Sequence, residues 1–246
     1  RKLLAMPIQG VQRRLRTGGL LRGGAIYHLV LLQLSHDASL KSHSNFDSVQ
    51  AFIREVFVAF AKGAPPHHRL IFKAHPFEDG REPLPKIIRT EAARIGLKDR
   101  VQFIPGGKLG PLLDGAKSTV TVNSTAAQQA LWRNLPVRAL GCSVFSKPEL
   151  VSQKPLAEFF AEPDAPEPDA YNYYRKFLLE TSQIGVGVYK QRGPAELLTR
   201  VVDMMLSPNN PYELEMHGSE IKVESPRLVV TSKIPLRDLE GRVIGV

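Results

Sequence analysis

The stretch LIFKAHPFEDG, Leu70 to Gly80, decides the fold that we predict for this chain. Its large apolar residues predict a buried strand, because strands that are covered on both faces are apolar throughout. Lys73, His75 and Pro76 follow at the carboxyl end, where parallel α/β sheets place their ligands. Proline lacks a backbone donor and favours an extended residue before it, so we expect Pro76 to hold the His75 imidazole just beyond the sheet.

Strands and amphipathic helices alternate on both sides of this stretch. We expect strands at 29–32, 70–74, 101–104, 119–122 and 136–140. Helices are expected between them at 45–61, 85–95, 109–116 and 125–133. The longest helix carries apolar residues at spacings of three and four from Val49 to Phe60. Alternation with short connections predicts an α/β fold, a doubly wound parallel sheet of the Rossmann-like kind.

The sequence suggests three regions. Residues 1–25 contain several arginines and two glycine pairs, and we interpret them as a linker or the remnant of an N-terminal domain, since Arg1 stands where Met is expected. Residues 26–218 form the Rossmann-like domain, with further helices expected at 155–160, 171–182 and 194–206. Residues 219–246 form a tail with β-prone pieces at 227–231 and 242–246, and the sequence defines no role for it.

Charge and cysteine usage narrow the possible partners and compartment. A net charge of +9 and a pI near 9.7 indicate an anionic partner, such as a phosphate ligand, nucleic acid or an acidic membrane surface. A single cysteine, Cys142, excludes an intrachain disulfide and fits a reducing compartment. No apolar run reaches the ~20 residues that cross a bilayer, and no secretory signal is visible. We therefore expect a cytoplasmic protein, with peripheral attachment to the inner membrane allowed.

A second strand end carries hydroxyl and amide groups. Asn123, Ser124 and Thr125 lie where the strand at 119–122 opens into a helix. Such residues commonly cap helices, so Ser124 has a structural role available without any ligand. Backbone N–H groups and the helix dipole at this place also favour phosphate binding. From the sequence both interpretations stay open.

His75 has two similar interpretations. A histidine at a strand end can simply satisfy a loop carbonyl. Beside a leaving phosphate, its imidazole would instead stabilise the charge that develops as a glycosyl bond breaks. Because parallel strands end at one edge of a sheet, we expect His75 and the turn at Ser124 to face one cleft.

The order of these motifs resembles the bacterial capsule-polysaccharide synthesis family, which includes β-Kdo transferases. The resemblance covers residues 28–160 and is carried by LQLSHD, FKAHP, GLKDRVQFI, TVNSTAAQQAL and LPVRALG. It implies the donor-binding half of a GT-B fold, in which two Rossmann-like domains enclose the active site. It also implies an inverting glycosyltransferase that moves an acidic sugar from CMP-Kdo or a similar CMP-sugar to a lipid-linked acceptor, without a cofactor or a metal ion.

The resemblance also assigns residues. His75 is the implied catalytic residue, which assists the departure of CMP. Contacts with the nucleotide or its phosphate are implied for Lys73, Pro76, Asn123, Ser124, Thr125, Gln33, Asp37, Gly141 and Glu149. The family's catalytic base lies in an acid-acid-Gly motif of the other Rossmann-like domain. Glu78-Asp79-Gly80 has the same letters but follows His-Pro, so we predict a loop turn there rather than the base.

Two other functions stay open. A non-catalytic capsule assembly or export component on the same scaffold would bind the donor without turnover. A nucleic-acid-binding protein is suggested by the pI and by Arg13-Arg14-Leu15-Arg16, but only 7% of the residues are aromatic, few for a stacking surface. We therefore expect a nucleotide sugar, a lipid-linked saccharide acceptor and the inner-membrane surface or capsule assembly proteins as partners, and no nucleic acid.

Overall fold

The computed structural model describes residues 24–183, 194–208, 210, 236–237 and 243–245. The chain divides into two compact units, Arg1–Lys176 and Phe177–Val246. Most of the predicted linker at 1–25, the β-prone piece at 227–231 and most of the predicted tail lie outside the described residues. The limits expected for the three regions stay a prediction.

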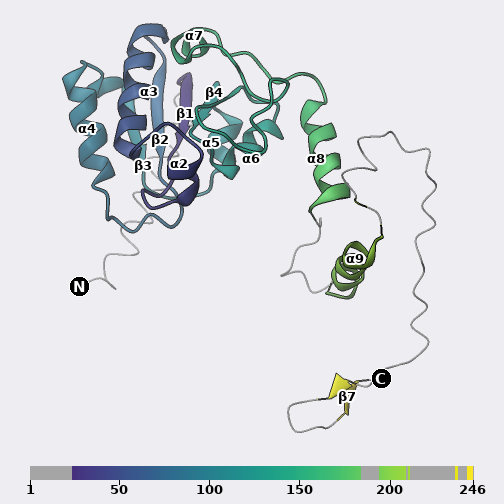
Figure 1. The fold of residues 1–246 in the computed structure, drawn as a ribbon. Helices are drawn as coiled ribbons and strands as arrows, with labels where there is room; N and C mark the ends of the chain where they lie inside the picture. The colour runs from purple at the N-terminus through teal and green to yellow at the C-terminus, as the bar shows by residue number, and fades with distance from the viewer. Residues whose placement is uncertain (1–23, 184–193, 209, 211–235, 238–242, 246) are drawn as a thin grey trace. The chain divides into compact units, whose positions relative to one another are not determined.

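The first unit is built around five parallel strands (Figure 1). Their order across the sheet is β3-β2-β1-β4-β5. The strands are β1 (Tyr27–Leu31), β2 (Arg69–Lys73), β3 (Val101–Ile104), β4 (Ser118–Thr121) and β5 (Val137–Ala139). Each lies within two residues of its predicted position, and the predicted α/β fold with a parallel sheet is confirmed. The carboxyl ends of all five strands form one edge of the sheet, which we call the carboxyl rim.

Helices cover both faces of the sheet, because successive side chains of a buried strand point to opposite faces. Val30 of β1 packs with α3 (Val49–Gly63), α4 (Leu84–Arg94) and α7 (Leu156–Ala161). Leu29 and Leu31 pack on the other face with α5 (Gly110–Asp114) and α6 (Gln128–Leu131). β1 is buried along its whole length, as the central strand of such a sheet requires.

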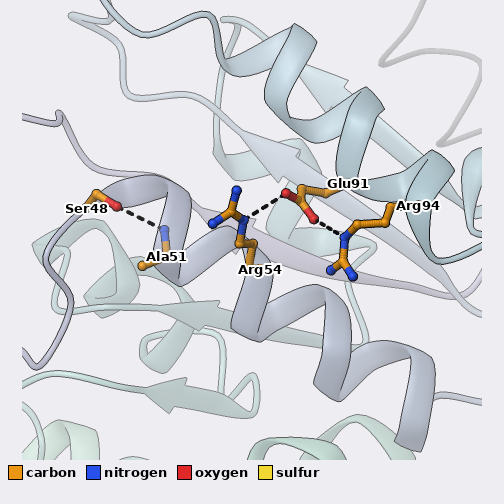
Figure 2. Close-up of polar contacts among 5 residues, drawn as sticks. All are labelled: Ser48, Ala51, Arg54, Glu91 and Arg94. Carbon is orange, nitrogen blue, oxygen red and sulfur yellow. Dashed lines mark hydrogen bonds and ion pairs between the residues drawn. The ribbon is translucent and has the colours of Figure 1, made fainter.

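A buried carboxylate joins α3 to α4 (Figure 2). The Glu91 side chain is 6% exposed and accepts hydrogen bonds from Arg54 Nε and Arg94 Nε, each at 2.8 Å. These bonds from Arg54 and Arg94 lower the pKa of Glu91 below its usual value. At the start of α3, Ser48 Oγ accepts from Ala51 N–H at 3.1 Å and caps the helix.

A second buried polar cluster lies at the amino ends of the strands. The His28 side chain is fully buried, with Nδ1 2.7 Å from Ser118 Oγ and Nε2 3.0 Å from His68 Nδ1. Desolvation by burial lowers the pKa of His28 to about 3, and the nearby positive groups of His68, Lys117 and Arg100 add to this effect. The imidazole is therefore neutral at physiological pH.

Several shorter elements complete the described chain. The helix α2 (Ala38–Ser42) was not expected from the sequence, which suggested a loop there. The 3-10 turns η1 (Lys98–Arg100) and η2 (Thr125–Ala127) precede β3 and α6. Helices α8 (Ala170–Thr181) and α9 (Pro194–Leu206) lie within a residue of their predicted limits, and β6 (Leu236–Arg237) pairs antiparallel with β7 (Val243–Gly245). No helix in the described ranges combines the length and apolar character needed to cross a membrane.

Candidate functional site at the carboxyl rim

The predicted motifs meet at the carboxyl rim on either side of β1. His75 follows β2, and the turn at Ser124 follows β4. Both strands pair with β1, whose chain continues to Gln33. Neighbouring strands lie ~4.8 Å apart, so the ends of β2 and β4 are separated by about 10 Å, a distance that one nucleotide spans. The structure thus brings the two motifs to one rim, while their roles stay predictions.

The His75 ring is held by the backbone that follows it. Phe77 N–H donates to His75 Nδ1 at 3.1 Å, and Glu78 N–H donates to the His75 carbonyl at 3.1 Å. Because Nδ1 accepts, the neutral imidazole carries its proton on Nε2. Within the described ranges no hydrogen bond to Nε2 is found, and the ring is half-buried. His75 can therefore present an N–H donor to a phosphate oxygen.

Lys73 and Pro76, on the two sides of His75, differ in burial. Lys73 is buried, and its Nζ donates to the Ala74 carbonyl at 2.8 Å, which keeps the ammonium at the end of β2. Pro76 is exposed and lies within the turn closed by Glu78 N–H. The next residues, Glu78-Asp79-Gly80, form a second turn: Glu78 Oε1 accepts from Gly80 N–H at 3.0 Å. The loop turn that we expected at these residues is present, while the absence of a catalytic base from them stays a prediction.

Gln33 and Asn123 bind each other across the rim. Gln33 Nε2 donates to Asn123 Oδ1 at 2.7 Å, and Asn123 N–H donates to Gln33 Oε1 at 3.0 Å. Asn123 Nδ2 also donates to the carbonyls of Ser39 and His43, at 2.9 and 3.3 Å. Asn123 is thus engaged with the protein through both amide donors and its oxygen. This arrangement fixes α2 and the loop after it against the end of β4, a role that the sequence did not reveal.

Asp37 is also part of this support. Its Oδ1 accepts from Ser39 N–H at 2.9 Å and caps α2, and its Oδ2 lies 3.4 Å from Gln33 Nε2. We expected Asp37 to line the cleft from a loop, whereas the structure shows it as the cap of a short helix. The capping residue was readable in the sequence, but five helical residues are too few to give a periodic signal.

The Ser124 turn combines a cap with accessible hydroxyls. Ser124 Oγ accepts from Ala126 N–H at 3.3 Å, so the capping role that was left open is present. Ser124 is half-buried and Thr125 is exposed. The helix expected at 125–133 is wrong in its form: η2 has three residues and α6 has four. A helix this short has a weak dipole, so phosphate binding here would depend on the hydroxyls and local N–H groups.

A cavity of about 600 Å³ opens at the β5 end of the rim. Its lining includes His43, Arg138, Gly141 and Cys142. Gly141 is required where the loop after α2 crosses β5, because a Cβ there would lie 2.8 Å from the His43 carbonyl oxygen and 2.9 Å from Val122 Cγ1. Gly141 therefore lines a cavity, which does not extend to His75 or Ser124, and its predicted contact with a ligand stays a prediction.

Arg138 is a residue of this cavity that sequence reasoning missed. Its Nη1 donates to the Ala139 carbonyl at 2.9 Å, while its Nε is buried and has no hydrogen-bond partner in the described part of the chain. Desolvation by burial lowers the pKa of Arg138. The residue stands inside a short apolar strand, and its place beside a cavity is seen only in the folded chain.

Glu149 is the last of the predicted site residues, and no metal ligands were predicted. Glu149 is exposed, and it is not among the residues that line the cavity. Its predicted place near the ribose or base has no support from this position and stays a prediction. Across the ranges that the structure describes, no three His, Cys, Asp or Glu side chains come together in a way that could hold a metal ion.

The curated relatives of this chain include two capsule polysaccharide proteins of different bacteria. The capsule polysaccharide export protein KpsS of Escherichia coli is 29% identical over 163 residues, which cover 66% of this chain and 42% of KpsS. The capsule polysaccharide modification protein LipB of Neisseria meningitidis serogroup A is 32% identical over 166 residues, 67% of this chain and 40% of LipB. The chain therefore spans about two fifths of the length of these relatives.

Solved structures resemble the chain in fold alone. KpsC of Thermosulfurimonas dismutans, a beta Kdo 2,7 transferase, gives a TM-score of 0.39 at 16% identity over 63% of this chain and 52% of KpsC. Anabaena HepE in complex with UDP-glucose gives a TM-score of 0.40 at 15% identity, over 63% of this chain and 41% of HepE.

A family model for capsule polysaccharide biosynthesis proteins matches residues 14–189. The matched region contains all five strands of the sheet and every residue of the candidate site. The match covers more than half of the chain and agrees with the order of motifs noted in the sequence. The chain belongs to the capsule polysaccharide biosynthesis protein family.

Proposed function

We propose that this chain binds a CMP-activated sugar along the carboxyl rim and supplies the donor half of a glycosyltransferase of capsule polysaccharide biosynthesis. The donor is CMP-Kdo or a similar CMP-sugar, and the acceptor is a lipid-linked saccharide. The observation that carries the proposal is the placement of the His75 Nε2 donor and the hydroxyls of Ser124 and Thr125 on the two sides of β1, at one rim.

The rim suggests the direction in which the donor lies. The 600 Å³ cavity at β5 has room for the nucleoside. Ser124 and Thr125 follow the neighbouring strand β4 and would hold the phosphate, and His75 follows β2 beyond β1. Three strand spacings separate β5 from β2, about 14 Å in all, which suits an extended nucleotide sugar.

This direction gives His75 a chemical task. Transfer breaks the bond between the anomeric carbon and the phosphate oxygen, and that oxygen keeps the electron pair. An N–H donor on His75 Nε2 would bind the oxygen as its negative charge develops, and so lower the barrier. The acceptor hydroxyl attacks from the opposite face and gives its proton to a base. By the family resemblance, this base would lie in the other Rossmann-like domain.

Charge and location enter the proposal as well. The chain carries 33 Lys and Arg against 24 Asp and Glu, and this excess suits both an anionic donor and an acidic membrane surface. We place the protein in the cytoplasm, peripheral to the inner membrane, where a lipid-linked acceptor would be presented.

The test is a calorimetric titration of CMP into the purified chain and two variants, His75→Ala and Ser124→Ala. Each variant should bind CMP about tenfold more weakly, because a hydrogen bond to a charged phosphate contributes about 1.5 kcal/mol. Thr90→Ala, at an exposed residue of α4 outside the rim motifs, serves as the control variant. Unchanged CMP affinity in both site variants would refute the assignment.

The cavity offers an independent readout. Cys142 is the single cysteine of the chain, is exposed and lines the cavity. If the nucleoside occupies the cavity, saturating CMP should slow alkylation of Cys142 by a maleimide at least tenfold. AMP at the same concentration controls for general nucleotide effects. Equal alkylation rates with and without bound CMP would place the nucleoside elsewhere.

A second function is a capsule assembly or export component that binds the donor without transferring sugar. The observations in its favour are the match to an export protein and the use of Glu78 and Asp79 in a local turn rather than as a base. Release of CMP in the presence of donor and a lipid-linked acceptor distinguishes the two. Donor binding without CMP release, using the full-length protein, would support the non-catalytic component.

A further inference from the structure

We propose that Phe77 and Lys108 form the subsite for the glycosyl group of the donor, at the end of the carboxyl rim where β2 and β3 lie. The inference rests on the proposed function, which directs the nucleoside toward β5 and the phosphate toward β4. A sugar attached to that phosphate continues past His75 in the direction of β2 and β3, because these strands occupy the other end of the sheet. Neither Phe77 nor Lys108 was a predicted site residue.

Phe77 is an aromatic side chain that the fold leaves in water. It is 80% exposed, the highest value among the large hydrophobic residues that the structure describes. Its ring centroid lies 5.6 Å from that of His75, and its N–H holds His75 Nδ1 at 3.1 Å. The turn closed by Glu78 N–H fixes this backbone. A ring held beside the leaving-group donor presents a flat apolar face on which a sugar ring can pack.

Lys108 stands on the neighbouring loop. β3 pairs with β2 through Lys73 and Ile104, and Ala74 N–H donates to the Ile104 carbonyl at 3.0 Å. The chain then turns through Gly107, whose φ is +88°, and reaches Lys108. Lys108 is exposed and makes no hydrogen bond or ion pair with any residue in the described ranges. Its ammonium is therefore available at the same end of the rim.

The acidic side chains near Phe77 are already engaged. Glu78 Oε1 accepts from Gly80 N–H at 3.0 Å, and Asp79 Oδ2 lies 2.8 Å from Arg81 Nε. Among the described residues, Lys108 therefore forms no ion pair with a carboxylate. The phosphate is assigned to the hydroxyls after β4, so a further cation beyond His75 suits a second negative charge on the ligand. An aromatic face and a cation on the neighbouring loops after β2 and β3 fit a sugar that carries a carboxylate, rather than a neutral hexose.

The experiment compares two ligands, CMP and freshly prepared CMP-Kdo, by calorimetric titration. The site variants are Phe77→Ala and Lys108→Met. Their matched controls are Trp132→Ala, an aromatic side chain 68% exposed near the start of β5, and Lys98→Met, an exposed lysine just before β3. Both controls lie toward the amino ends of the strands. Thermal melting of each variant checks that the chain remains folded.

We expect each site variant to raise the Kd for CMP-Kdo about tenfold and to leave the Kd for CMP within about twofold, since only the glycosyl group reaches this end of the rim. The controls should change neither Kd. If the site variants leave the Kd for CMP and the Kd for CMP-Kdo unchanged, or raise both equally, the subsite is refuted while the nucleotide site stands. If the unaltered chain binds neither ligand, the proposed function fails, and the subsite fails with it.

Discussion

Asn123→Ala separates the structural role of the amide from the ligand contact that its sequence motif suggested. In the structure the Asn123 side chain makes three hydrogen bonds, to Gln33, Ser39 and His43, at 2.7, 2.9 and 3.3 Å. Removing the side chain leaves one buried donor and two carbonyl acceptors without these partners. At about 1 kcal/mol for each lost bond, the free energy of unfolding should fall by about 3 kcal/mol.

The assay is urea denaturation followed by circular dichroism, with and without CMP. A loss of this size should also lower the melting temperature by about 6 to 12 °C for a chain of this length. Asn172→Ala is the control, because Asn172 is exposed and, among the residues that the structure describes, its amide reaches only Asp169, at 3.1 Å. That variant should stay within about 0.5 kcal/mol of the parent.

A double-mutant cycle completes the test. Gln33→Ala removes the other half of the reciprocal pair, so Gln33→Ala and Asn123→Ala together should destabilise the chain by at least 0.5 kcal/mol less than the sum of the single changes. The reasoning is refuted if Asn123→Ala leaves unfolding unchanged but abolishes CMP binding, since Asn123 would then be a ligand contact rather than a support.

Three further predictions concern His28, Glu91 and Gly141. The pKa of His28 is lowered from 6.5 to about 3 in the folded chain, so the unfolded chain takes up a proton first as the pH falls. The free energy of unfolding should therefore fall as pH drops from 6.5 toward 3, by about 5 kcal/mol in total. Urea titrations at pH 7 and pH 4 should show about 3 kcal/mol of this loss, because the rest falls below pH 4. His28→Gln should reduce the difference, and a pH-independent His28 contribution would contradict the prediction. The pKa of Glu91 is lowered in the folded chain, so its contribution to stability is present above the unfolded pKa of 4.5 and is lost as pH falls through the lower folded pKa. Glu91→Gln should lower the free energy of unfolding by about 1 to 2 kcal/mol at pH 7 and by less in acid. Equal costs at both pH values would argue against the ion pairs. Gly141→Ala should lower the free energy of unfolding by about 1 to 3 kcal/mol and weaken CMP binding, because its Cβ would meet the His43 carbonyl oxygen at 2.8 Å. Gly110→Ala is the control, since its Cβ would meet only a flexible Arg133 nitrogen at 3.3 Å, and it should be nearly neutral in the same assays.

The periodicity of apolar residues determined the element order. The residues from Val49 to Phe60 recur at helical spacing, and the helix α3 forms there because that face is buried against the sheet. Parallel strands also follow from short alternating connections, so the sequence alone was enough to bring His75 and Ser124 to one rim. Short elements such as α2 and η2 gave no period and were missed or given the wrong length.

Tertiary structure decided how those residues are used. Gln33 and Asn123 lie 90 positions apart, and only the placement of β1 beside β4 makes them partners. The cavity at Gly141 is lined jointly by the loop after α2 and the chain that follows β5, and the exposure of Phe77 depends on a turn beyond the sheet. Local pattern reports which face of an element is buried, whereas contacts between distant segments depend on strand order, which no local pattern contains.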